Sequence, residues 1–121
     1  MRTFLSEGVS PVSRLTTIYA VDDPGPGGAN HEYGIVAVKD GHTVNASIKF
    51  QKGGLAEVPL NGISDEALLT VVADRLRAFQ SGPFSCRENG VALTHLDSAL
   101  LWLGKRTMDR ERRGVEGKQE A

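Results

Sequence analysis

The sequence predicts an α+β fold, with a small antiparallel β-sheet in the N-terminal part and an antiparallel α-helical hairpin in the C-terminal part. Prolines and most glycines of this 121-residue chain precede residue 63 or lie in one later turn, and β-branched runs fall between them. From Ser64 onward the sequence is rich in Leu, Ala, Arg and Glu. This length allows one domain, or two sub-domains that share a core.

Three strands are predicted in a β-rich region, residues 16–62. They cover residues 16–21, 33–38 and 43–50, and Asp40-Gly41 joins the last two as a hairpin turn. Apolar and polar residues alternate over 43–50, which predicts one face on a core. Residues 55–60 suggest a short edge strand. Residues 1–15 are expected to be a weakly ordered segment, unstructured over about the first ten residues.

A helical hairpin is predicted over residues 63–117, followed by a tail at 118–121. Ser64 is a natural N-cap of the first helix, and Gly82-Pro83 ends that helix. The S-x-x-E pattern of residues 85–88 opens the second helix, which would run to Gly114, about 28 residues or about 42 Å. The second helix therefore overhangs the first by about three turns. This overhang would be solvated or would pack on another chain.

Charge and composition argue against several classes of protein. Fourteen basic and fifteen acidic residues give a net charge of −1, unlike a general nucleic-acid coat. The single cysteine, Cys86, fits a reducing cytosol. No apolar run approaches the roughly 20 residues of a membrane span, and no secretory signal is visible. The histidines lack ligand spacing and no Ser-His-acid set stands out, so no metal, no cofactor and no catalytic residue is assigned.

The end of the second helix carries a row of arginines beside a tryptophan. Trp102, Arg106, Arg110 and Arg113 lie on one helical face. Such a row could bind phosphates, in a small ligand or in RNA or DNA. Basic residues also complement the dipole at a helix C-terminus, and spacing alone favours this ordinary solvated face.

Three other features have two interpretations each. The glycine-rich loop 23–30 could aim backbone amides at a phosphate, but a series of tight turns is the simpler interpretation. Phe79 could pack in a core or stack on a base. Asn89, one turn into the second helix, hints at a polar partner.

Residues 61–79 and the string Thr94-His95-Leu96-Asp97-x-Ala99-x-x-Trp102 resemble the helical hairpin of phage signal-sponge proteins. That hairpin is shared by the first-described Thoeris anti-defence sponges and by smaller, all-helical anti-CBASS sponges. The β-rich N-terminal part of this chain fits the Thoeris type. The resemblance covers about residues 16–117.

The resemblance implies sequestration without chemistry, in the cytoplasm of an infected bacterial host. Members bind cyclic ADP-ribose isomers, such as glycocyclic ADP-ribose from the defence TIR enzyme, and some also bind cyclic trinucleotides of the CBASS pathway. They assemble as dimers, often three in a hexamer, and neither a membrane nor long nucleic acid is an expected partner. A small nucleic-acid-binding protein that uses the arginine-rich helix end remains the alternative.

The resemblance also implies two sets of ligand-binding residues. For the cyclic ADP-ribose isomer the matching positions are Phe79 and Asn89, with a loop that closes the pocket and contains Gly27, Gly28 and Asn30. For the cyclic trinucleotide they are Arg106 and Arg110.

Overall fold

The computed structural model describes residues 1–5 and 7–118, which form two compact units. The sheet unit contains residues 1–53 and 58–62, and the helical unit contains residues 54–57 and the chain from Ile63 onward. Within the described ranges, no helix is both long enough and apolar enough to cross a membrane.

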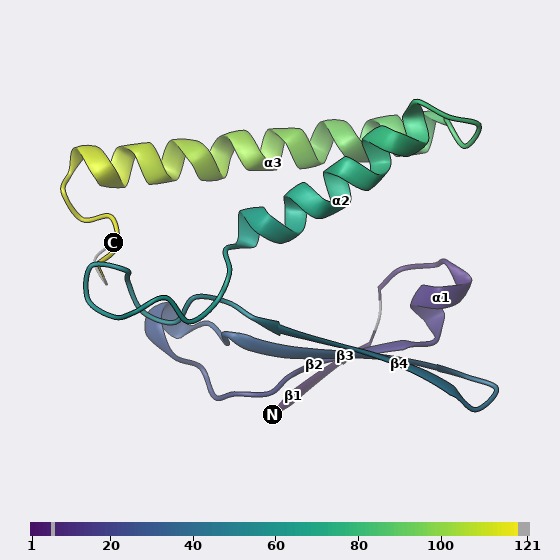
Figure 1. Ribbon diagram of the computed structural model, residues 1–121, viewed down its shortest axis with the longest axis horizontal. Coiled ribbons are helices and arrows are strands. Elements are labelled where there is room, and N and C mark those ends of the chain that lie inside the picture. Colours follow the sequence, from purple (N-terminus) through teal and green to yellow (C-terminus); the bar gives the residue numbers. More distant parts are fainter. Residues whose placement is uncertain (6, 119–121) are drawn as a thin grey trace. The chain divides into compact units, whose positions relative to one another are not determined.

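The sheet unit is built on four antiparallel strands in the order β1-β2-β3-β4 (Figure 1). Their bounds are Arg2–Leu5 for β1, Thr16–Ala20 for β2, Glu32–Lys39 for β3 and His42–Lys49 for β4. The short helix α1, Pro11–Arg14, lies between β1 and β2 in the chain, and the 3-10 turn η1, Pro26–Gly28, lies between β2 and β3. The predicted α+β class and its three strands are confirmed.

The β3–β4 hairpin turns at Asp40-Gly41, as predicted. Lys39 pairs with His42, which leaves a two-residue loop. Asp40 has φ 49° and Gly41 has φ 78°, the left-handed values that this kind of tight hairpin turn requires at both central positions. Aspartate tolerates this conformation better than most residues, and glycine adopts it without steric cost.

The first strand differs from the expectation of an unstructured N-terminal segment. Arg2 pairs with Ala20 and Leu5 with Thr17, in antiparallel register with β2. Four residues carry too little alternation to identify a strand from sequence. Pairing with a strand more than ten residues away provides the missing stabilisation, which is a tertiary effect. Of the predicted tail 118–121, residues 119–121 lie outside the described residues.

The predicted edge strand at residues 55–60 is absent from the described structure, and this prediction is wrong. The chain makes a turn there, in which the amide of Glu57 donates to the carbonyl of Gly54 at 2.9 Å. Further along, the Gln51 side chain bonds the carbonyl of Pro59 and the amide of Asn61. Side-chain hydrogen bonds therefore take backbone groups that a strand partner would need, and Pro59 has no amide to donate.

Little apolar surface is fully buried in this single chain. Among the described residues, Ala20 and Ala73 are the buried apolar ones. The alternation in β4 predicted a core-facing row, but Val44 is 69% exposed. Strand β4 is an edge of the sheet, and no strand within residues 1–5 and 7–118 pairs with its outer side. Tyr33 and Phe50 make an edge-to-face aromatic pair, with ring centroids 5.9 Å apart.

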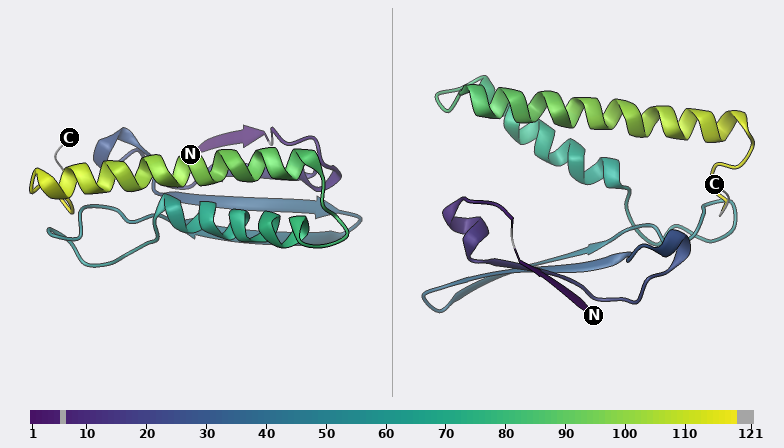
Figure 2. Two further views of the ribbon diagram at one scale, coloured as in Figure 1. Left: turned by 90° about the horizontal axis from the view of Figure 1, so that it is seen from above. Right: turned by 180° about the vertical axis from the view of Figure 1, so that it is seen from behind.

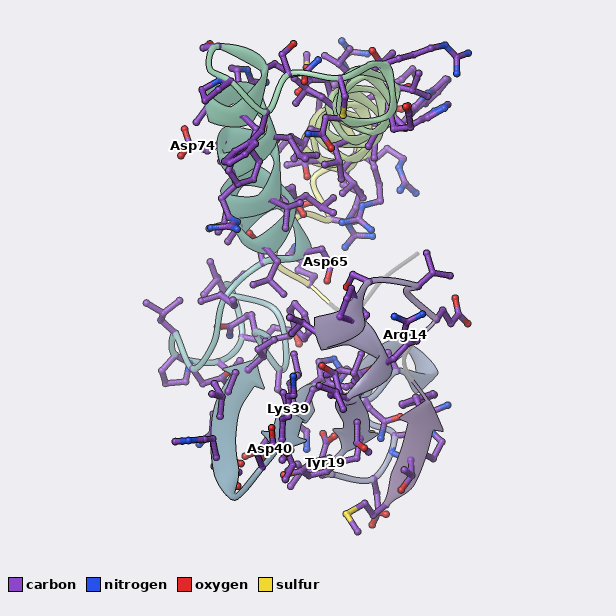
Figure 3. All side chains as sticks on the ribbon, turned by 90° about the vertical axis from the view of Figure 1, so that its right-hand side faces the viewer. Arg14, Tyr19, Lys39, Asp40, Asp65 and Asp74 are labelled. Atoms are coloured by element: carbon purple, nitrogen blue, oxygen red, sulfur yellow. The ribbon has the colours of Figure 1, made fainter. Side chains whose placement is uncertain are left out.

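Two antiparallel helices dominate the helical unit (Figures 1 and 2). Helix α2 spans Asp65–Gln80 and helix α3 spans Arg87–Arg112. Ser64 caps α2 as predicted, because its hydroxyl accepts the amide of Ala67 at 3.1 Å. Figure 3 shows Asp65 at the start of α2, where a carboxylate favours the positive end of the helix dipole, and Asp74 on the side turned away from α3.

Helix α3 begins one residue later than the S-x-x-E pattern predicted. Its N-cap is Cys86 and not Ser85. The side-chain amide of Gln80 brackets the Cys86 backbone, accepting from its amide and donating to its carbonyl, both at 3.0 Å. This clamp fixes the point at which the chain enters the helix. Because α3 has 26 residues and α2 has 16, α3 overhangs by about 15 Å, which confirms the predicted three turns.

Candidate functional site

Four side chains gather where α2 turns into α3, and we call them the hairpin-turn cluster: Arg75, Phe79, Phe84 and Asn89. The Phe79 and Phe84 rings lie edge to face, with centroids 6.2 Å apart. The guanidinium carbon of Arg75 lies 5.4 Å from the centre of the Phe79 ring. The Asn89 side chain donates to the carbonyl of Phe84 at 3.4 Å. The turn thus presents two aromatic rings, one cation and one amide together.

The chemistry of the hairpin-turn cluster suits a nucleotide. An aromatic ring offers a face on which a purine can stack. A guanidinium beside that ring can pair with a phosphate, and an amide offers both a donor and an acceptor to a base or ribose. Phe84 is largely exposed and Phe79 is partly exposed, so both rings are within reach of a ligand.

A second set of side chains lines a groove at the other end of α3. The cavity has a volume of about 510 Å³, and its lining residues are Trp102, Lys105, Arg106, Asp109, Arg110 and Arg113. We call it the α3 groove. It contains Arg106 and Arg110, the two arginines that the family resemblance implies for a cyclic trinucleotide. The indole of Trp102 is 68% exposed beside them.

Positive charge in the α3 groove is partly neutralised by carboxylates. Lys105 pairs with Asp109 at 3.0 Å, and this hydrogen bond and charge hold the pKa of Asp109 below its ordinary value. Arg110 pairs with Glu116 at 3.1 Å and is only 18% exposed. Arg106, one turn before Arg110, is exposed. The α3 groove therefore contains one exposed guanidinium, on Arg106, and one partly covered guanidinium, on Arg110.

The glycine-rich loop is organised around Asn30 and Asp22. Asn30 is 5% exposed, accepts a hydrogen bond from Arg2 and donates to the carbonyl of Asp22. The Asp22 carboxylate accepts the amides of His31 and Glu32 at 3.1 Å. Partial burial alone would raise the pKa of Asp22, but these amides and Asn30 hold it below its ordinary value. Asn30 is therefore bound within its own loop.

Gly27 and Gly28 lie in η1 of the same loop, with φ 74° and 82°. The amide of Gly28 donates to the carbonyl of Gly25 at 2.9 Å, and the amide of Gly25 donates to Ala29 at 2.8 Å. These bonds correspond to the tight-turn interpretation of the loop. The loop belongs to the sheet unit, whereas Phe79 and Asn89 belong to the helical unit.

Comparison with known proteins identifies the hairpin. Residues 43–108, more than half of the chain, match the family described as Acb2/Tad1, hairpin domain. The chain belongs to this family. It is also similar to a protein named Thoeris anti-defense 1 from Bacillus phage SBSphiJ7, with 48% identity over 85 residues, or 70% of this chain. The chain spans 60% of the length of that phage protein.

The matched region of the Acb2/Tad1 family contains most of the two site candidates. The hairpin-turn cluster lies entirely within residues 43–108, and so does Arg106. Arg110 and the glycine-rich loop lie outside the match. No group of three metal-ligating side chains occurs in residues 1–5 and 7–118.

Arg75, Asp22 and Glu116 are among the residues of these sites that sequence reasoning missed. Arg75 lies four residues before Phe79 on α2, a helical spacing that could have identified it. Asp22 follows the end of β2 by two residues and precedes the glycine-rich loop, a position typical of loop-capping carboxylates. Glu116 follows α3 by four residues, and no spacing rule links it to Arg110 across the intervening turn.

We expect Asp22→Ala to loosen the glycine-rich loop. The amides of His31 and Glu32 lose their acceptor, so their hydrogen exchange should accelerate and the thermal midpoint should fall. Because the folded pKa of Asp22 lies below its ordinary value, its carboxylate stabilises the fold at neutral pH, and this contribution disappears as the pH falls through the folded pKa. The difference in thermal midpoint from wild type should therefore shrink in strong acid.

The matched control is Asp23→Ala, which removes the adjacent, exposed carboxylate. Asp23→Ala should leave both amides protected. Equal effects of the two variants would show that Asp22 does not organise the loop.

Proposed function

We propose that this protein is an anti-defence sponge, which binds cyclic nucleotide immune signals and sequesters them without degrading them. The main ligand in this proposal is a cyclic ADP-ribose isomer, such as the glycocyclic ADP-ribose of Thoeris TIR enzymes. The second is a cyclic trinucleotide of the CBASS pathway. The observation that carries the proposal is the hairpin-turn cluster, which gathers stacking, cationic and amide groups within the Acb2/Tad1 hairpin.

The hairpin-turn cluster matches the parts of a cyclic ADP-ribose isomer. Phe79 offers a face to the adenine, Arg75 offers charge to the pyrophosphate, and Asn89 offers its amide to a ribose or base edge. The Asn89 bond to Phe84 is long, at 3.4 Å, so exchanging it for a ligand costs little. Gly27, Gly28 and Asn30 of the glycine-rich loop are further proposed ligand-binding residues, and Asn30 is held inside that loop.

The α3 groove matches a phosphate ring. Arg106 and Arg110 lie one turn apart, and guanidinium groups grip phosphate with two parallel hydrogen bonds. A cyclic trinucleotide carries three phosphates in near three-fold symmetry. Three copies of the arginine pair around a three-fold axis would meet all three phosphates.

A homo-oligomer is part of the proposal, as a dimer or as three dimers. The single chain buries little apolar surface, and α3 exposes Leu101, Trp102 and Met108. Burying such side chains against another copy is favourable by about 25 cal/mol per Å². Strongly hydrated anions also need an enclosed site, which several copies form more readily than one small chain. The proposed place of action is the cytoplasm of the infected bacterial host.

A release assay tests sequestration directly. The protein is incubated with glycocyclic ADP-ribose, separated from free ligand, and heated to unfold it. We expect the released ligand to keep its mass and its chromatographic position, because the proposed site binds the ligand but does not react with it. A hydrolysed ligand would mean an enzyme that destroys the signal.

Titration calorimetry over cyclic ADP-ribose isomers, cyclic trinucleotides and duplex DNA completes this test. Saturable binding of a small ring supports the proposal. Salt-sensitive binding to DNA with no binding to any ring would replace it with a nucleic-acid-binding protein.

A further inference from the structure

The chain after α3 folds back and covers one of the two groove arginines. The Glu116 carboxylate accepts from Arg110 Nε at 3.1 Å, and the carbonyls of Val115 and Lys118 both accept from Arg110 Nη2 at 2.8 Å. The backbone of Val115 also donates to the Arg110 carbonyl at 3.1 Å. One guanidinium therefore holds three residues of the C-terminal segment, residues 114–118.

The same segment is fastened on its other side to the loop before α2. The amide of Ala56 donates to the carbonyl of Gly117 at 3.0 Å. The two backbones approach so closely that a Cβ atom on Gly54 would overlap the Gly117 carbonyl, and Gly117 has φ 79°. Figure 2 shows the C-terminal segment returning from the end of α3. The C-terminal segment is thus held by hydrogen bonds to Arg110 on one side and to Ala56 on the other.

The position of Glu116 has a consequence for the proposed phosphate site. A phosphate that binds the Nε edge of the Arg110 guanidinium competes with Glu116, because both are anions that bind the same N–H donor. Arg106 is exposed, so it can meet a ligand first. We infer that Glu116 is an internal competitor for anions at Arg110, and that a cyclic trinucleotide binds the α3 groove fully only by displacing it. This inference rests on the proposed function of that groove.

Glu116→Gln tests the competition with almost no change in shape. The variant loses the anion but keeps the two backbone carbonyls that bind Arg110. We expect its affinity for cyclic triadenylate to rise about two- to ten-fold, the effect of releasing a partly exposed ion pair. Affinity for glycocyclic ADP-ribose should stay at the wild-type value.

Glu111→Gln is the matched control, because it removes the same charge from an exposed position in the last turn of α3. A general charge effect would raise the affinity of both variants equally and would overturn the inference. Hydrogen exchange of the Ala56 and Val115 amides reports whether the segment keeps its place. Unchanged triadenylate affinity in Glu116→Gln would also overturn the inference.

Trimetaphosphate, a cyclic trianion without bases, separates this inference from the proposed function. If Glu116→Gln binds trimetaphosphate more tightly than wild type while no nucleotide ring binds, the competition is supported and the sponge proposal fails. If wild type binds glycocyclic ADP-ribose but Glu116→Gln gains no affinity for either trianion, the sponge proposal stands and the competition fails.

Discussion

Phe79→Ala is expected to abolish most binding of glycocyclic ADP-ribose. Stacking a base on an aromatic ring contributes about 1–3 kcal/mol, so the dissociation constant should rise about 5- to 150-fold. The substitution also removes the ring beneath the Arg75 guanidinium and the edge-to-face partner of Phe84. Asn89→Ala should weaken the same ligand through its amide. Calorimetry with glycocyclic ADP-ribose measures both effects.

Two further variants separate stacking from folding. Phe79→Trp keeps an aromatic face and should retain binding, whereas Phe79→Leu keeps apolar bulk without a ring and should lose it. All variants should bind cyclic trinucleotides as wild type does, since Phe79 and the α3 groove lie at opposite ends of the hairpin. Loss of both ligands together would show that the two sites are not separate.

Arg106→Ala is expected to weaken binding of the cyclic trinucleotide and to leave binding of glycocyclic ADP-ribose intact. A hydrogen bond to a charged group contributes about 1.5–3 kcal/mol, which predicts a roughly 10- to 150-fold loss of cyclic trinucleotide affinity. If three copies of the protein bind one cyclic trinucleotide, the Arg106→Ala variant loses three such contacts to each bound ligand, and the loss of affinity is larger. Arg110→Glu should also lose this ligand, by charge reversal. Binding of glycocyclic ADP-ribose should remain.

Arg112→Ala provides the control for charge alone. Arg112 is exposed near the same helix end, pairs weakly with Asp109 at 3.5 Å, and does not line the α3 groove. Its loss should change affinity only slightly. Arg106 is the cleaner test of the two groove arginines, because Arg110 also holds the C-terminal segment. An unchanged trinucleotide affinity in Arg106→Ala would refute the assignment of this groove.

Local sequence signals predicted the elements that depend on local chemistry. The Asp40-Gly41 turn and the Ser64 cap are both set by a few neighbouring residues, and both were predicted correctly. Strand β1 and the start of α3 depend on partners elsewhere. Strand β1 forms because it pairs with β2, and the start of α3 is fixed by the hydrogen bonds between the Gln80 side chain and the Cys86 backbone. Such contacts leave little trace in a local pattern.

The candidate sites divide in the same way. Phe79 and Asn89 were predicted through resemblance, and the structure places both at the α2–α3 turn, where Phe84 links them. Helical spacing correctly placed Arg106 and Arg110 on one face. The partners of these residues were not predicted. Arg75 was overlooked among surface charges, and Glu116 reaches Arg110 only because the chain reverses after α3.

The length of α3 bears on how the protein can change over generations. From Asn89 to Arg106 the helix advances 17 residues, or about 25 Å, so no side chain belongs to both sites. Substitutions at one end therefore leave the chemistry of the other intact. If the proposed function holds, a change in one host messenger would select for substitutions at one end of α3 and leave the residues at the other end unchanged.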